Sequence, residues 1–145
     1  MQKITPFLWF DGNVEEAVTF YVSVFKDARI VSMTPMTATF ELMGQEFYAL
    51  NGGPRHKFTE AVSFFIKCET QDEVDYYWEK LTANGGAEQP CGWLKDRFGL
   101  SWQVIPNALG AYLSGNDQAK AQRVMQAMLQ MKKIIIEDLN KAAAA

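Results

Sequence analysis

Apolar and polar positions divide the chain into two segments of the same design. Residues 4–10 form an apolar run rich in aromatic side chains, which predicts a buried strand. Residues 13 to about 27 carry an apolar stripe at helical spacing. Residues 61–67 predict a second strand, and residues 70–81 a second amphipathic helix. Each segment therefore begins with a strand followed by a helix.

The two helix starts also match. Asn13 and Thr70 are residues that commonly cap helices, and each has a glutamate three positions later, Glu16 and Glu73, as in a capping box. Gly85-Gly86 can adopt the left-handed backbone conformation that commonly ends a helix, here the second one. An offset of 57 residues superimposes Phe7 on Phe64, Asn13 on Thr70, Ala17 on Val74, Tyr21 on Trp78 and Val24 on Leu81. Agreement of caps and stripes in one register indicates a duplication.

Three short strands are predicted after each helix. They cover about residues 29–36, 37–43 and 45–50 in the first segment, and about 88–93, 94–98 and 100–105 in the second. Met43-Gly44 favours a tight hairpin, and an offset of 55 residues aligns Gly44 with Gly99 and Phe47 with Trp102. Each segment thus reads βαβββ.

The predicted architecture is α+β, with two βαβββ repeats that form curved mixed sheets around a cavity. One domain spans residues 1–145, with repeat one at about 1–53, repeat two at about 58–106, and a linker at 51–57 between them.

A C-terminal helical segment is predicted at about residues 116–142. Its apolar stripe lies on a helix that begins near Asp117. The β-branched run at 134–136 predicts a break, followed by a short turn to Lys141. We expect this segment to close the domain or to contact a partner subunit.

The composition and charge of the chain exclude several classes of protein. With 48% hydrophobic residues and a net charge of −3, the chain suits a folded domain and has no basic face for nucleic acid. Two cysteines, Cys68 and Cys91, suit a reducing compartment. No apolar stretch reaches the length of a membrane span, and the N-terminal residues lack the apolar region of a signal peptide. We expect a cytoplasmic protein that contacts neither membrane nor nucleic acid.

Several longer motifs resemble those of a known family. They span nearly the whole chain: Phe10-Asp11-Gly12-Asn13-Val14-Glu15-Glu16-Ala17, Ala49-Leu50-Asn51-Gly52-Gly53-Pro54, the stretch from Cys91 to Gln103, and the stretch from Lys120 to Met128. They resemble the PhnB-like group of the vicinal oxygen chelate superfamily, which includes glyoxalase I, bleomycin-resistance proteins and extradiol dioxygenases. The resemblance implies the paired βαβββ fold and a homodimer.

PhnB-like proteins often bear the label 3-demethylubiquinone-9 3-methyltransferase. A methyl donor is usually bound at a glycine-rich turn after a strand in a doubly wound sheet. Neither Gly52-Gly53 nor Gly85-Gly86 stands at a strand-to-helix junction of the predicted fold. We therefore do not expect methyl transfer.

The resemblance also implies positions for a divalent ion, held in the superfamily by His, Glu or Gln side chains from four strands. Here those positions fall on Gln103, on Tyr48, on Thr5 or Pro6, and on Val62 or Ser63, with Glu46 as a competitor if the register shifts by two. This set contains no imidazole, and the sole histidine, His56, lies in the linker. We predict no metal and no cofactor.

The predicted ligand-binding residues are Tyr48, Asn51, Cys91, Trp93 and Gln103. Alternation along a strand turns Tyr48 and Gln103 toward the cavity and Phe47 and Trp102 under the helices. Two of the five have a structural alternative: Asn51 as a turn former, and Cys91 as a small residue packed against Trp93.

Three functions are compatible with these observations. We favour a metal-free protein that binds a small, partly aromatic molecule in an apolar cavity. The alternatives are an enzyme, either metal-dependent or dependent on Cys91, and a structural protein whose cavity is filled by side chains.

Overall fold

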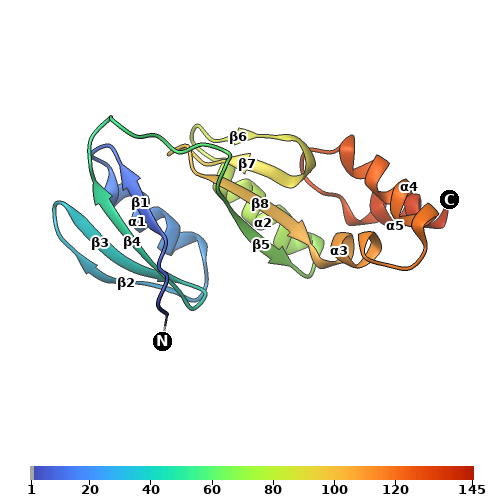
Figure 1. Cartoon of the computed structure of the whole chain (residues 1–145), viewed down its shortest axis with the longest axis horizontal. Coiled ribbons are helices and arrows are strands. Elements are labelled where there is room, and N and C mark those ends of the chain that lie inside the picture. Colours follow the sequence, from blue (N-terminus) through green and yellow to red (C-terminus); the bar gives the residue numbers. More distant parts are fainter. Residues whose placement is uncertain (1) are drawn as a thin grey trace. The chain divides into compact units, whose positions relative to one another are not determined.

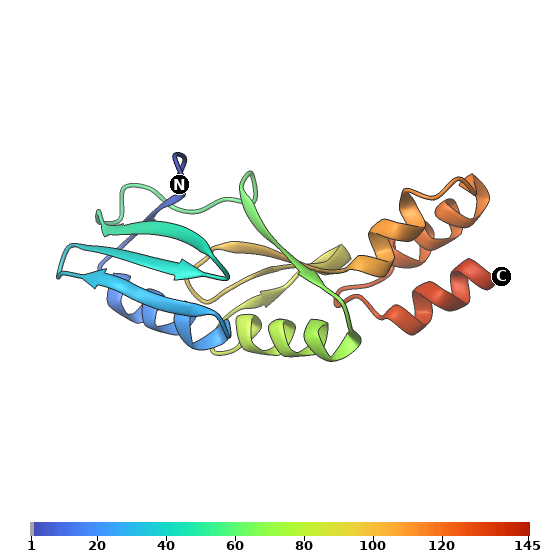
Figure 2. The same ribbon diagram turned by 90° about the horizontal axis from the view of Figure 1, so that it is seen from below.

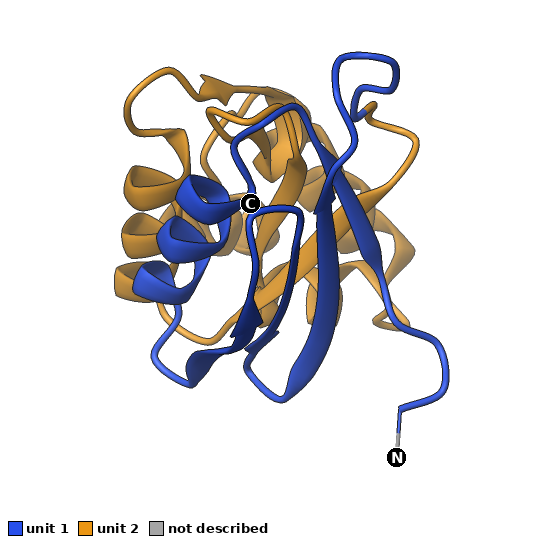
Figure 3. Ribbon diagram, turned by 90° about the vertical axis from the view of Figure 1, so that its left-hand side faces the viewer, with its two compact units in different colours: residues 1–58 blue, residues 59–145 orange. Residues whose placement is uncertain are grey.

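The computed structural model describes residues 2–145, and the chain divides into two compact units at Phe58–Thr59 (Figures 1 and 3). Each unit contains one four-stranded sheet with a helix on one of its faces. The division falls next to the linker that the sequence places at residues 51–57. Among the helices of residues 2–145, none combines the length and the apolar character needed to cross a membrane.

Unit 1 is a single βαβββ module with strand order β1-β4-β3-β2. β1 runs parallel to β4, and the other neighbours are antiparallel. Its elements are β1 (Phe7–Phe10), α1 (Val14–Val24), β2 (Ala28–Met33), β3 (Thr37–Leu42) and β4 (Gln45–Asn51).

Unit 2 repeats the module with strand order β5-β8-β7-β6 and continues into three helices (Figures 1 and 2). β5 runs parallel to β8, while β6, β7 and β8 pair in antiparallel fashion. Its elements are β5 (Ser63–Cys68), α2 (Gln71–Thr82), β6 (Ala87–Glu88), a 3-10 turn η1 (Pro90–Gly92), β7 (Trp93–Lys95), β8 (Ser101–Pro106), α3 (Asn107–Leu113), α4 (Gln118–Leu129) and α5 (Ile136–Ala144). The predicted α+β class with two βαβββ repeats is confirmed.

One face of each sheet packs against its helix and forms the core of the unit. Alternation places Phe47 and Trp102 on this face, and they are only 5% and 3% exposed, as predicted. The predicted hairpin at Met43-Gly44 is also confirmed, because both residues adopt positive φ, as a two-residue type I′ turn requires.

The predicted offset of 57 residues between the first strands of the two repeats, which aligns Phe7 with Phe64, is wrong by one residue. Phe7 pairs with Tyr48 and lies on the face away from α1, whereas Phe64 packs against Trp102 on the face toward α2. The structural equivalent of Phe7 is Phe65, one residue further than the helix offset predicts. The stretch from strand to helix is therefore one residue shorter in unit 2, which the helix stripes alone do not reveal.

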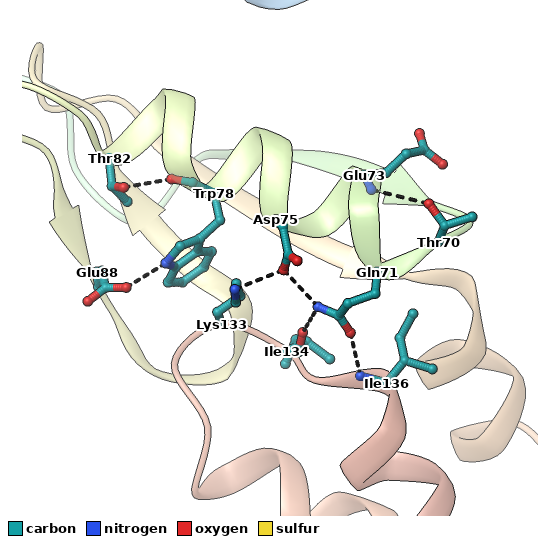
Figure 4. A network of polar contacts seen from close by, with 10 residues as sticks. All are labelled: Thr70, Gln71, Glu73, Asp75, Trp78, Thr82, Glu88, Lys133, Ile134 and Ile136. Carbon is teal, nitrogen blue, oxygen red and sulfur yellow. Dashed lines mark hydrogen bonds and ion pairs between the residues drawn. The ribbon is translucent and has the colours of Figure 1, made fainter.

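The predicted cap at Asn13 is wrong. The Asn13 side chain makes no capping hydrogen bond, and its Oδ1 is buried without a partner among the described residues. Asn51 supplies the cap instead, because its Oδ1 accepts from the Val14 amide at 3.0 Å. The capping box at Thr70 is confirmed: its Oγ1 accepts from the Glu73 amide at 3.2 Å (Figure 4).

The strand predicted at residues 88–93 is shorter than expected. Only Ala87–Glu88 pair as β6, and a 3-10 turn at Pro90–Gly92 follows. Pro90 has no amide hydrogen for the ladder, so it ends the strand. The β7 strand then begins at Trp93 rather than at Leu94.

Beyond β8 the chain is more helical than its sequence pattern predicts. α3 was not predicted, and α5 is a full helix where a short turn to Lys141 was expected. The predicted start at Asp117 is confirmed, since its carboxylate accepts from the Lys120 amide. The three helices share a small core made of Ile105, Leu109, Val124, Ile134, Leu139 and Ala143.

Candidate functional site

The face of the second sheet that lies opposite α2, called here the distal face of unit 2, carries an aromatic row. Phe65 on β5, Gln103 on β8 and Trp93 on β7 are direct partners across three adjacent strands. Partners in neighbouring strands point to the same face, so the amide of Gln103 lies between the two aromatic side chains. Phe65 is 53% exposed, which is high for a phenylalanine within a sheet.

A polar row lies next to the aromatic row on the same face. Ser63, Ser101 and Lys95 are partners across the same three strands. The amide Nε2 of Gln103 donates to Oγ of Ser63 at 3.0 Å, which joins the two rows. The Ser101 hydroxyl is buried and has no hydrogen-bond partner within residues 2–145.

The ammonium of Lys95 is paired with a carboxylate from outside the sheet. Lys95 Nζ lies 2.5 Å from Oε1 of Glu60, which precedes β5 in the chain. The hydrogen bond and the positive charge of Lys95 lower the pKa of Glu60 below its ordinary value. This pair lies at the edge of the polar row.

A buried carboxylate fixes the turn between β7 and β8. Asp96 is 3% exposed, and its Oδ1 accepts from the amides of Phe98 and Leu100 at 2.9 and 3.1 Å. Its Oδ2 accepts from the indole Nε1 of Trp102 at 2.9 Å. Gly99 adopts φ +89°, as this short turn requires. Asp96 therefore acts on the fold and sets the register in which Trp93 and Gln103 lie side by side.

Cys91 lies in the turn before β7, outside the aromatic row. It adopts φ +64°, and its amide donates to the Met131 carbonyl at 2.8 Å. Gly92 donates to the Lys132 carbonyl at 2.8 Å, and a Cβ at Gly92 would lie 2.6 Å from the side chain of Ile105. The turn is thus held by the C-terminal segment, and the Cys91 side chain is half-buried.

The first sheet has an equivalent row on the face opposite α1, the distal face of unit 1. Phe7, Tyr48 and Thr39 are partners there, and the rings of Phe7 and Tyr48 meet edge to face with centroids 5.6 Å apart. Tyr48 corresponds to Gln103, because Phe7 pairs with Tyr48 as Phe65 pairs with Gln103.

The rest of this face is partly covered by the segment after β4. Trp9 donates its indole hydrogen to the Gly53 carbonyl at 2.9 Å, and His56 contacts its ring with centroids 4.7 Å apart. A Cβ at Gly52 would lie 2.3 Å from the Trp9 ring, so only glycine fits this approach. Tyr48 stays 38% exposed.

Asn51 has both ends of its amide committed to the fold of unit 1. Its Oδ1 caps α1 through the Val14 amide, and its Nδ2 donates to the Pro35 carbonyl at 3.0 Å. Of the five predicted site residues, the structure therefore brings Trp93 and Gln103 together. Tyr48 lies on the other sheet, Asn51 at a helix start and Cys91 in a turn.

The residues at the superfamily's ion positions do not fit a divalent ion. Gln103 and Ser63 offer a neutral amide and a hydroxyl, already bonded to each other, and Tyr48 offers a phenol. Glu46 stands two residues before Tyr48, so it is not the equivalent of Gln103. Within the described range 2–145, no three His, Cys, Asp or Glu side chains are grouped so that they could hold an ion. We derive no chemical step through a metal.

Sequence reasoning missed Phe65, Ser101, Lys95 and Glu60. Phe65 was missed because the helix offset selects Phe64. The residue pair Phe64-Phe65 held the signal, since adjacent residues in a strand face opposite sides. Ser101 and Lys95 alternate with apolar residues of β8 and β7, which would have placed them on the face of Gln103.

Comparison with known proteins gives a family match over most of the chain. The profile of the family described as 3-demethylubiquinone-9 3-methyltransferase matches residues 2–105. The solved structure of the PhnB protein from Bacillus cereus, which bears the same description, is 36% identical. The match covers 72% of this chain and 99% of that one, with a TM-score of 0.67. No curated protein matches.

More distant structures share the fold alone. Protein PA1353 from Pseudomonas aeruginosa is 21% identical over 73% of this chain and 98% of that one, with a TM-score of 0.59. The fosfomycin resistance protein FosX from Listeria monocytogenes, solved with Mn(II) and sulfate, is 14% identical. That match covers 70% of this chain and 87% of FosX, with a TM-score of 0.54.

Proposed function

We propose that this chain, which belongs to the PhnB-like 3-demethylubiquinone-9 3-methyltransferase family, binds a small organic molecule on the distal face of unit 2 without a metal ion. Its fold is of the glyoxalase and bleomycin-resistance type. Among the predicted site residues, Trp93 and Gln103 carry the proposal, and Tyr48 is the corresponding candidate on unit 1.

The observation that carries this proposal is the row of Phe65, Gln103 and Trp93. Phe65, on the outer strand β5, is 53% exposed and so leaves apolar surface in water, which is unfavourable unless something covers it. Aromatic side chains around one amide are typical of sites that hold a flat organic molecule by stacking and orient it by a hydrogen bond.

Methyl transfer, the activity in the family's description, is not part of the proposal. Three junctions lead from a strand to an α-helix: those at residues 11–13 and 69–70 hold a single glycine, Gly12, and β8 runs into α3 with no residue between them. Both sheets are small and mixed rather than doubly wound. In the part of the chain that the structure describes, none of these junctions offers the glycine-rich turn that usually binds such a donor.

An enzyme dependent on Cys91 is the second candidate. The left-handed backbone of Cys91 favours it, because strained positions often accompany function. The hydrogen bonds of this turn to the Met131 and Lys132 carbonyls explain the same strain without catalysis. Binding is therefore the stronger proposal.

A screen of one-ring and two-ring aromatic compounds by thermal shift tests the proposal. A ligand of the distal face raises the melting temperature of the wild type by mass action. Phe65→Ala should abolish this rise. Tyr76→Ala is the matched control, since Tyr76 is an aromatic residue of the same unit, 38% exposed, on α2. Equal shifts in wild type and Phe65→Ala would contradict the proposed site.

We further propose that the protein is a cytoplasmic homodimer. Two free cysteines suit the reducing cytoplasm, and the exposed aromatic residue Phe7 of unit 1 suits association. Sedimentation equilibrium measures the oligomeric state, and a monomer at all concentrations would contradict the dimer.

A further inference from the structure

The polar row of Ser63, Ser101 and Lys95 lies beside the aromatic row, and stacking of a ligand ring would not need it. Strands lie about 4.8 Å apart, so the three side chains cover a strip about 10 Å wide. Ser101 is the middle member, with Ser63 on one side and Lys95 on the other. All three project from the face that carries Gln103.

This polar row is rich in hydrogen-bond donors. The Ser63 oxygen accepts from Gln103, which leaves its own proton available to another acceptor. The Ser101 hydroxyl is buried without a partner in the described structure, which is unfavourable for a polar group. The ammonium of Lys95 has three donors, and one points to Glu60. An acceptor with several lone pairs would satisfy these groups together.

The ion pair of Glu60 with Lys95 shows that a carboxylate can bind at the edge of the polar row. Its carboxylate lies 2.5 Å from Lys95, although its side chain is 55% exposed and comes from a segment outside the sheet. An exposed ion pair of this kind contributes little to stability. A ligand carboxylate with better geometry can therefore replace Glu60 at small cost.

The two rows are two residues apart along each strand, which corresponds to about 7 Å. An acid with one aromatic ring spans this distance, with its ring between Phe65 and Trp93 and its carboxylate over the polar row.

We propose that the distal face of unit 2 binds planar aromatic carboxylic acids. The carboxylate takes hydrogen bonds from the hydroxyls of Ser63 and Ser101 and pairs with Lys95, while Glu60 moves into solvent. This inference rests on the proposed function and adds the class of ligand to it.

Isothermal titration with benzoate, benzamide and phenyl phosphate tests the assignment. The account predicts that benzoate binds the wild type at least tenfold more tightly than its neutral analogue benzamide. Lys95→Met should remove this difference. Lys67→Met is the matched control, because Lys67 is an exposed lysine on the same face of β5, in register with Ile105 rather than with Ser101. It should keep the difference.

Two further variants should change the affinity for benzoate in opposite directions. Ser101→Ala should weaken benzoate binding severalfold, since it removes one of the donors. Glu60→Gln should strengthen it severalfold, because the competing carboxylate is gone. Both changes leave the core intact, so they also keep the test valid if Lys95→Met fails to fold.

The outcomes separate the two proposals. Equal affinity for benzamide and benzoate would overturn the carboxylate assignment while the proposed binding face stands. Tenfold tighter binding of phenyl phosphate than of benzoate would also overturn the carboxylate assignment. If no probe binds, with heats no larger than dilution, both proposals are overturned.

Discussion

At the scale of single residues, the side-chain amide of Asn51 caps α1, although the local sequence predicts that Asn13 does so. Asn51 lies at the end of β4 and reaches the first amide of α1, so the helix start is held from a distant part of the chain. Asn13 occupies the capping position, yet its φ/ψ of −123°/29° is not the extended geometry usual for a cap. Capping is thus tertiary in unit 1 and local in unit 2.

This difference gives a first prediction. Asn51→Ala should lower the free energy of unfolding by about 1–2 kcal/mol, because the Val14 amide loses its partner. Asn13→Ala is the matched control and should not lower stability, because the buried Oδ1 of Asn13 has no hydrogen bond to lose. Urea unfolding followed by circular dichroism measures both. A larger loss for Asn13→Ala would refute the assignment of the cap.

The buried thiol of Cys68 gives a prediction about pH. Burial raises its pKa from 9.0 to about 12 in the folded protein. Below pH 9 the thiol is protonated in both states, and above it the unfolded chain loses the proton first. The free energy of unfolding should therefore fall as pH rises from about 9 toward 12.

Tyrosines and lysines titrate in the same range, so the test compares two proteins. The unfolding free energy of Cys68→Ala should decline less steeply between pH 8.5 and 10.5 than that of the wild type, by about the contribution of one thiol. Parallel curves would show that Cys68 titrates alike in both states.

At the scale of elements, one side chain of the second module bonds the backbone on both sides of the start of α5. Gln71, in the first turn of α2, donates to the Ile134 carbonyl at 3.0 Å and accepts from the Ile136 amide at 2.7 Å (Figure 4). Asp75 pairs with Lys133 at 2.8 Å beside it. The start of α5 is therefore set by a residue that belongs to the second βαβββ module.

Gln71→Ala should loosen this junction. We expect faster hydrogen exchange in residues 134–144 and a loss of about 1–2 kcal/mol in stability, because two backbone groups lose their partners. Gln126→Ala, an exposed glutamine on α4, should leave the exchange unchanged. Equal protection in wild type and Gln71→Ala would contradict the role of Gln71.

The sequence predicted the elements better than their exact alignment. Helix stripes and the Thr70 capping box placed α1 and α2 because these patterns are local. The strand offset failed by one residue, since helix periodicity says nothing of the length of the junction before it. α5 was missed because the run Ile134-Ile135-Ile136 obscures a helix that begins at its last residue.

The candidate site was predicted only in part, because local patterns show which face of a strand a residue lies on but not which distant residues it contacts. Alternation along β8 placed Gln103 on the distal face without knowledge of the fold. The roles of Asn51 and Ser101 depend on partners from distant parts of the chain, which no local pattern contains.

At the scale of the whole molecule, the family match and the added segment divide the chain. The match ends at residue 105, and the Bacillus cereus relative is covered over 99% of its length by 72% of this chain. The three C-terminal helices, which include the stretch 120–128 that the sequence resemblance had taken in, lie outside the residues matched by the family. They pack on the end of β8 around Ile105 and Ile134, and they hold the turn before Trp93.

We propose that the positions of Tyr48 and Gln103 serve an organic ligand rather than a metal ion. Elemental analysis of protein purified without chelators, followed by titration with zinc, manganese and nickel, tests it most directly. We expect far less than one ion per chain after purification and no saturable tight uptake. One tightly bound ion per chain, lost when Gln103 is replaced by alanine, would contradict it.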